Sequence, residues 1–337
     1  MNKLNKIGVS ALCGSLAAIS AVNAGELTVT GGADMTWMSQ DDSVTGNPLG
    51  IGSNYGLSGS GELDNGWSVA LSIAMTNANA YSNTSITVGV PGVGDILFNQ
   101  GGSGTGIQRL DDVTPTVWEE ADGAGLSATI NKISGGSAGA TIEIKPEAVP
   151  DGLTARFAYT ADADGSSSTS DKGTGGDSGV AGAGWDLTLE ASDALHGMAG
   201  LTVYAGMANV DQYANGAATT GDREEYVWGA KYAIGGFTVG YQKSNEETGV
   251  TGTTEYDNTA YGITFNVNDN LSIGYGHVES DESGQGLESP EANTFSAAYT
   301  MGGATFRIAD ISVDNQGYSA ATTADLDSRV VSLGLAF

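Results

Sequence analysis

The chain ends on Val331-Ser332-Leu333-Gly334-Leu335-Ala336-Phe337, in which large apolar side chains alternate with small or polar ones. Successive side chains of a β-strand point to opposite faces, so Val331, Leu333, Leu335 and Phe337 would share one face. A last strand that is apolar on one face and small on the other fits a closed barrel with lipid outside and water inside. A half-buried strand of a soluble sheet would alternate in the same way, so the rest of the chain has to decide between the two folds.

The other end of the chain predicts export. Lys3 and Lys6 precede the mostly apolar stretch 7–22, and Val22-Asn23-Ala24 provides the small residues that a signal peptidase reads. We therefore expect residues 1–24 to be a cleaved signal peptide and residues 25–337 to form one barrel domain. A first membrane-spanning helix is the competing interpretation, but the stretch is short for a bilayer and leads directly into alternating sequence.

Composition narrows the class of exported protein. The 337 residues include 52 Gly, 13 Tyr and 6 Pro, and the single cysteine, Cys13, lies in the expected leader. No later apolar run is long enough for a spanning helix. The leader holds 2 of the 12 basic residues and none of the 40 acidic ones, so the mature chain has 10 against 40, a formal charge of −30. This excess excludes nucleic-acid binding, which needs a basic surface.

Alternation with a period of two recurs along the mature chain and predicts about sixteen strands. The clearest example is 67–76, and the turn Asp64-Asn65-Gly66 before it suits a tight hairpin, because Asn-Gly accepts positive φ angles. Short turns alternate with polar loops near 162–178, 211–221, 246–254, 280–289 and 313–324. The predicted fold class is all-β, a transmembrane antiparallel barrel, and at this strand number the cylinder keeps an aqueous channel.

One connection is much longer than the others and is the third external loop by strand order. It joins the expected strands near 95–100 and 138–145 and has about 37 residues, a length that is usually functional. Its segment 109–122 contains five carboxylates. Residues 126–130 show some alternation, but we assign them to the loop.

These features together resemble the general diffusion porins of Gram-negative bacteria, in particular those of the alphaproteobacterial kind. The resemblance covers residues 25–337 and rests on the leader, the order of short turns and long loops, the acidic third loop and the terminal Phe337. It implies a sixteen-stranded homotrimer among outer-membrane lipids, through which ions and small hydrophilic solutes diffuse passively. It also implies that the third loop folds into the lumen and that the barrel-assembly machinery reads the last strand.

The resemblance places acidic residues of the third loop at one side of a constriction. The candidates are Asp111, Asp112, Glu119 and Glu120. A solvated charge cluster on an outward loop is the alternative. The family supplies the opposite, basic side largely from early strands, yet this sequence has no Lys or Arg between Lys6 and Arg109.

Strand parity and position give the remaining candidates for the lumen. The basic ones are Arg109, Lys145, Arg156, Lys231 and Arg307, and the acidic ones are Asp34, Glu62, Glu143 and Glu225. Because the acidic ring is weakly compensated, we expect a pore that prefers cations.

Other functions fit the sequence less well. A substrate-specific channel usually has an aromatic track or an arginine ladder, and neither is clear here; a secreted β-rich adhesion or structural protein without a pore is the more distant alternative. Catalysis is not expected, because His196 and His277 are scattered and in no recognisable motif. No cofactor is expected, although loop carboxylates could hold Ca²⁺ loosely, since hard cations favour oxygen ligands.

Overall fold

The computed structural model describes residues 27–40, 47–77, 80–100, 104–111, 113–123, 125–136, 139–163, 181–212, 221–251, 255–283 and 287–336. The expected signal peptide and the candidates Asp112 and Phe337 lie outside these residues. Among the described residues, no helix is both long and apolar enough to span a bilayer.

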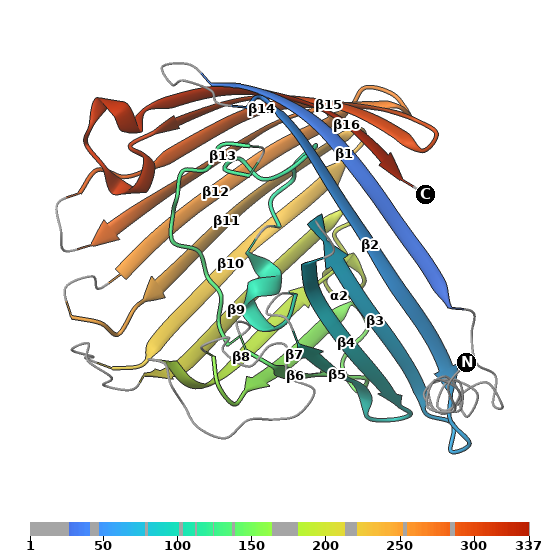
Figure 1. The fold of residues 1–337 in the computed structure, drawn as a ribbon. Coiled ribbons are helices and arrows are strands. Elements are labelled where there is room, and N and C mark those ends of the chain that lie inside the picture. Colours follow the sequence, from blue (N-terminus) through green and yellow to red (C-terminus); the bar gives the residue numbers. More distant parts are fainter. Residues whose placement is uncertain are drawn as a thin grey trace, which may run out of the picture.

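Sixteen strands form one closed antiparallel barrel, in which each strand pairs with its neighbours in sequence and β1 pairs with β16 (Figure 1). The predicted fold class is confirmed. The strands are β1 (Thr28–Gln40), β2 (Leu49–Glu62), β3 (Ser68–Thr76), β4 (Ala80–Val90), β5 (Gly94–Gln100), β6 (Thr141–Pro146), β7 (Leu153–Thr160), β8 (Ala181–Ala191), β9 (Leu201–Gln212), β10 (Arg223–Ile234), β11 (Phe237–Glu247), β12 (Glu255–Asn266), β13 (Leu271–Ser283), β14 (Glu291–Met301), β15 (Ala304–Asp314) and β16 (Leu326–Ala336).

Connections at one end of the barrel are short and most at the other end are long. Gly66, in the turn between β2 and β3, has a φ of 80°, as the Asn-Gly pair predicts. The turn between β8 and β9 contains a four-residue helix, α2 (Asp193–His196). The connection between β3 and β4 is an exception, because it is short although it lies at the end of the long loops.

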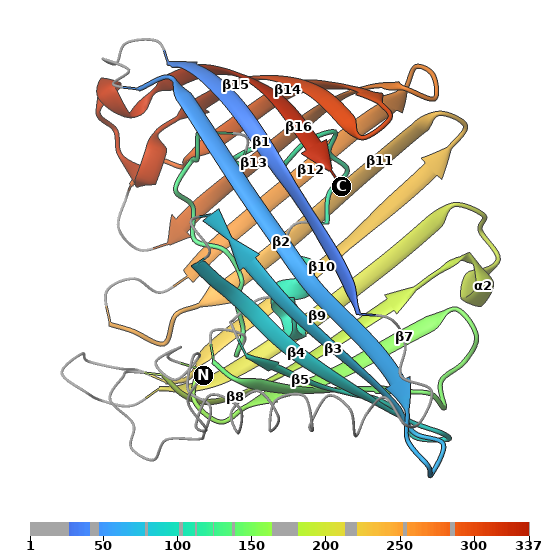
Figure 2. The same cartoon turned by 45° about the vertical axis from the view of Figure 1, so that its right-hand side comes forward.

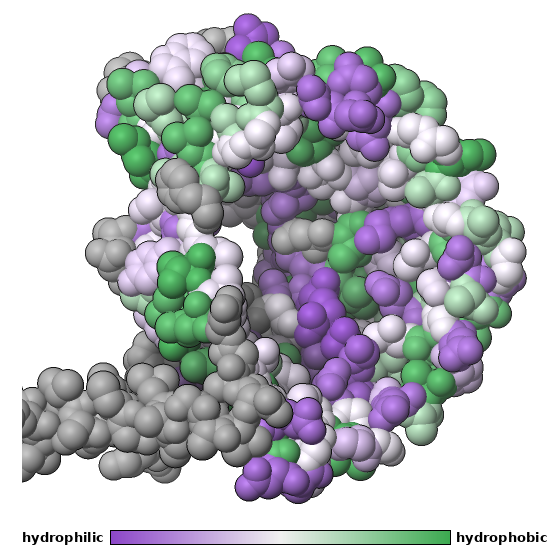
Figure 3. All heavy atoms as spheres, turned by 90° about the vertical axis from the view of Figure 1, so that its right-hand side faces the viewer, coloured by the Kyte–Doolittle hydropathy of each residue, from purple (hydrophilic) through white to green (hydrophobic). Residues whose placement is uncertain are grey.

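The strands turn their apolar side chains outward. Across the pairing of β1 with β16, Met35 lies opposite Leu333 and Trp37 opposite Val331, and this face also carries the exposed Leu335. Ser332, on the other face, is buried. Figure 3 shows the opening that the strands enclose, with hydrophilic side chains along its border.

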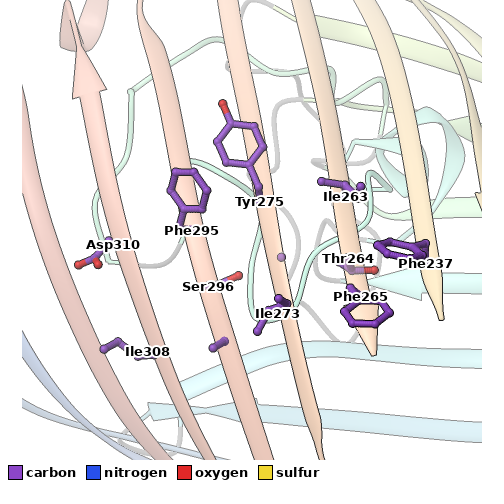
Figure 4. Close-up of a pocket in the computed structure, with 12 residues that line it drawn as sticks. Phe237, Ile263, Thr264, Phe265, Ile273, Tyr275, Phe295, Ser296, Ile308 and Asp310 are labelled. Atoms are coloured by element: carbon purple, nitrogen blue, oxygen red, sulfur yellow. The ribbon is translucent and has the colours of Figure 1, made fainter. Parts of the chain in front are cut away.

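An apolar groove of about 460 Å³ lies on the outward face of β11–β15 (Figure 4). Phe237 and Phe265 stack at its end near the short turns, with ring centroids 4.3 Å apart, and Tyr275 and Phe295 pair at 4.8 Å farther along the strands. Its aromatic and large apolar side chains point away from the lumen, so the groove is not part of an aqueous path.

An ion pair on the inner face of the barrel bridges the last strand, β16, where it pairs with the first strand, β1. Asp34 of β1 reaches over Gly334 of β16 to Arg307 of β15, with 2.9 Å between Oδ1 and Nη1. A Cβ added at Gly334 would lie 2.5 Å from the Asp34 carboxylate and 3.0 Å from the Arg307 guanidinium. A side chain at position 334 would therefore require this pair to move.

We predict that Gly334→Ala lowers the free energy of unfolding by up to about 1 kcal/mol, because the added methyl displaces the partly exposed pair of Asp34 and Arg307. Denaturant unfolding in detergent micelles, followed by tryptophan fluorescence, measures the change. Gly52→Ala in β2 is the matched control, since its Cβ would be 3.4 Å from the nearest atom, an ordinary contact. Equal losses in the two variants would contradict the special role of Gly334.

Candidate functional site

The third loop connects β5 to β6 and lies against the inward faces of the later strands. In Figures 1 and 2 this teal segment runs between strands β2–β4 and strands β10–β13. Glycines in the wall permit the approach: a Cβ at Gly206 would be 3.1 Å from Ile107, and one at Gly274 would be 2.7 Å from Val117. Small residues in the wall therefore set the path of the loop.

Two apolar clusters hold the loop on the wall. Near its start is the 3₁₀ helix η2 (Gly106–Leu110). The first cluster joins Ile107, Leu110 and Ile133 of the loop to Tyr204, Ala208 and Val227 of β9 and β10. The second joins Ala121, Leu126 and Ala128 to wall residues that include Val278, Ala292, Ile311 and Val330. The region 126–130 forms no strand, in agreement with its assignment to the loop.

A carboxylate of β6 binds the start of the loop. Glu143 is only 1% exposed and accepts hydrogen bonds from the Arg109 guanidinium at 2.8 Å, from the Arg156 guanidinium at 3.2 Å and from the Gly106 backbone N–H at 2.9 Å. Its side chain points inward, as strand parity predicts, but the loop covers it. Glu143, Arg109 and Arg156 therefore fix the loop to the wall, and Glu143 does not line the water column.

A second set of contacts binds the end of the loop. Glu225 of β10 has no exposed surface and accepts hydrogen bonds from the backbone N–H groups of Ser134 at 2.9 Å and Gly135 at 2.7 Å. Arg223 pairs with Glu225 at 3.2 Å and donates to the Gly135 carbonyl at 2.6 Å. Asp186 of β8 accepts from the Gly136 N–H at 3.2 Å. Glu225, like Glu143, is an inward residue that the loop removes from water.

The middle of the loop brings several charged residues together. Lys132 lies 3.4 Å from the Glu120 carboxylate and 3.3 Å from that of Asp122. The Arg307 guanidinium, already bound to Asp34, lies 5.9 Å from the centre of the Trp118 ring. We call Trp118, Glu119, Glu120, Asp122 and Lys132, together with Asp34 and Arg307, the charged cluster.

Glu119 differs from the other carboxylates of the charged cluster. It is only partly exposed, and no ion-pair partner is found for it among the described parts of the chain. Partial burial raises the pKa of Glu119 above its usual value, Glu120 raises it further, and Arg307 opposes both. A carboxylate that takes up a proton more readily than an ordinary glutamate therefore lies beside the lumen.

The other predicted residues are not members of the charged cluster, although Asp111 lines the same small cavity as Glu120 and Lys132. Asp111 is half-buried, and its backbone carbonyl accepts from Gln242 at 3.0 Å. Lys145 pairs loosely with Asp95 at 3.9 Å, near a short turn. Glu62 ends β2, and Lys231 is inward-facing in β10, also near the short turns.

The described residues contain no group of three or more His, Cys, Asp or Glu side chains that could hold a metal ion. His277 is on the outward face, stacked on Tyr261 with centroids 4.4 Å apart, and His196 ends α2. The two histidines are thus in different surroundings and belong to different elements.

A model of the Gram-negative porin family matches residues 8–307. The chain belongs to this family. Among solved structures, the anion-selective porin from Comamonas acidovorans has a TM-score of 0.67 and 16% identity, with 93% of this chain and 100% of that chain covered. OmpF of Salmonella typhi, in complex with daunomycin, has a TM-score of 0.68 and 14% identity, with 93% and 98% covered.

A trimer form of OmpT, an outer membrane protein of Vibrio cholerae, has a TM-score of 0.63 and 13% identity, with 94% of this chain and 100% of that chain covered. A comparison with curated proteins finds no match. At these identities the structural likeness concerns the fold. Family and fold together identify this porin as an outer-membrane channel.

We predict that Glu143→Gln lowers the free energy of unfolding by about 2–4 kcal/mol, because it leaves two guanidinium groups without their carboxylate. Denaturant unfolding and proteolysis of the region 104–136 are the measurements, with faster cleavage expected in the variant. Asp95→Asn is the control: it breaks an exposed pair and should cost no more than about 1 kcal/mol. Unchanged stability and cleavage in Glu143→Gln would show that Glu143 does not hold the loop.

Proposed function

We propose that this porin forms a water-filled pore for the passive diffusion of ions and small hydrophilic solutes, and that the pore prefers cations. The observation that carries the preference is the charge balance of the charged cluster. Its carboxylates are Asp34, Glu119, Glu120 and Asp122, whereas its cations are Arg307 and Lys132. Four carboxylates against two cations leave two negative charges in excess.

We propose further that the third loop narrows the lumen at this level. The contacts of its residues with β9, β10 and β13 support a path along the inner wall. The loop then leaves a passage between its own charged residues and the early strands. In a narrow aqueous gap bordered by low-dielectric walls, an excess of negative charge attracts cations and repels anions.

The fold by itself does not fix the sign of this preference. The Comamonas acidovorans porin is described as anion-selective, yet it shares the barrel with a TM-score of 0.67. We infer that the side chains at the constriction determine selectivity. Here both cations of the charged cluster already have carboxylate partners, so neither offers a free positive charge to a passing anion.

The remaining parts of the proposal concern assembly. The trimer form recorded for the Vibrio cholerae protein supports a homotrimer here, and the outward aromatic side chains support contact with lipid headgroups. We also propose export through a signal peptide at residues 1–24 and insertion by the barrel-assembly machinery. The proposal includes no catalysis, no cofactor and no structural calcium.

We predict a reversal potential of cation-selective sign for the wild-type protein in a planar bilayer under a salt gradient. Glu119→Gln should lower the cation-to-anion permeability ratio roughly fivefold, because one charge at about 4 Å contributes on the order of 1 kcal/mol in water. Glu62→Gln, an inward glutamate near the short turns, is the control and should change the ratio little. A reversal potential of anion-selective sign in the wild type would refute the proposed preference.

The preference should also depend on pH. Because the pKa of Glu119 is raised, this group loses its charge at a higher pH than an ordinary exposed glutamate as the pH falls. We expect the cation preference to be complete above the raised pKa and to begin falling as the pH drops through it. Glu119→Gln should lack this first fall. The same pH profile in wild type and variant would contradict the role of Glu119.

A further inference from the structure

We infer that the constriction selects solutes by their net charge and not by charge separation within the solute. A small organic cation should pass faster than a zwitterion of similar size. The inference rests on the proposed function, since it names the class of solute that the same pore favours.

The wall formed by the early strands supplies the first observation. Strands β1–β5 lie within residues 28–100, and this part of the sequence contains no Lys or Arg. Besides the carboxylates of Asp34, Glu62 and Asp95, their inward faces carry hydroxyl and amide groups in register across strands. One row is Thr28, Ser58, Ser72, Ser85 and Asn99, each paired with the next. This wall can accept or donate hydrogen bonds, but it offers no positive charge.

The cations of the remaining wall and of the third loop supply the second observation. Arg109 and Arg156 share Glu143, Arg223 pairs with Glu225, and Lys132 lies between Glu120 and Asp122. Arg307 is bound to Asp34. Lys231, for which no ion pair is found within the described ranges, lies near the short turns. Both cations of the charged cluster, Lys132 and Arg307, are thus paired with carboxylates beside them. Neither forms a basic side of the pore opposite an acidic one.

These two observations determine the electrostatic interactions of a zwitterion with the constriction. A pore with acidic groups on one side and basic groups on the other attracts both ends of a zwitterion. Here the ammonium end is attracted by the excess of carboxylates, and the carboxylate end finds hydroxyl and amide groups. Attraction of one end and repulsion of the other nearly cancel, because both lie within a few ångströms of the same charges. A cation of similar size has only the attractive part.

The recess beside the Asp34–Arg307 pair offers a position at which to test the inference. It has a volume of about 480 Å³, and its lining includes Asp34, Asn54 and Arg307. Asn54 belongs to β2, in the wall that lacks cations, and pairs with Gly32 of β1. Asn54→Arg would add a positive charge there, and Asn54→Gln would keep the amide without a charge.

The test is the release of labelled solutes from proteoliposomes at neutral pH. Choline is the cation, glycine betaine is the zwitterion with the same trimethylammonium group, and a pentose is the neutral reference. For the wild type we expect choline to leave roughly fivefold faster than betaine, and betaine no faster than the pentose. Asn54→Arg should bring the ratio of choline to betaine close to one, and Asn54→Gln should not change it. Ser72→Arg, on the same wall, serves as a second variant if Asn54→Arg does not assemble.

The outcomes separate this inference from the proposed function. Release of the pentose together with equal rates for choline and betaine in the wild type would overturn the inference and leave the channel in place. Retention of all three solutes would overturn the channel, and the inference with it. A wild-type preference for choline that neither arginine variant reduces would also overturn the inference, because the preference would then not depend on the absence of cations from this wall.

Discussion

Backbone hydrogen bonding imposes the strongest constraint on this structure. A wall that crosses lipid has no water to satisfy its N–H and C=O groups, so every strand needs a partner on both sides. The pairing of β1 with β16 provides the last of these partnerships, over nine residue pairs from Gly32 with Ala336 to Gln40 with Ser328. The alternation of the terminal stretch follows from the same constraint, because a strand in this position has lipid on one face and the lumen on the other.

The backbone N–H groups of the third loop also need hydrogen-bond acceptors inside the barrel. Its backbone donors near the wall would be costly without acceptors, and acidic side chains of the wall supply them. Glu143 accepts from Gly106, Glu225 from Ser134 and Gly135, and Asp186 from Gly136. The acidic character of the chain therefore has two separate roles, since some carboxylates hold the loop in place and others remain beside the water.

The division between these roles could not be predicted from the sequence. Strand parity is a local property, and it correctly suggested sixteen strands and an inward direction for Glu143 and Glu225. It could not show that residues more than 80 positions away in sequence, such as Ser134, would cover Glu225. The importance of Trp118, Lys132 and Asp186 was missed for the same reason, because each acts through a contact between distant segments. For Lys132 a weak signal existed, since it is one of only two cations in the sequence of an acidic loop.

The ion pair formed by Asp34 and Arg307 contributes both to the stability of the barrel and to the charge that determines ion selectivity. It bridges β1 and β15 over the last strand, and so contributes to closure of the wall. It also neutralises the cation nearest to the partly exposed Glu119, and Trp118 covers the same guanidinium. Removing Arg307 would therefore increase the excess of negative charge and weaken the closing contact at once. Glu119 lies outside this pair, so its charge can be removed without taking away either partner of the closing contact.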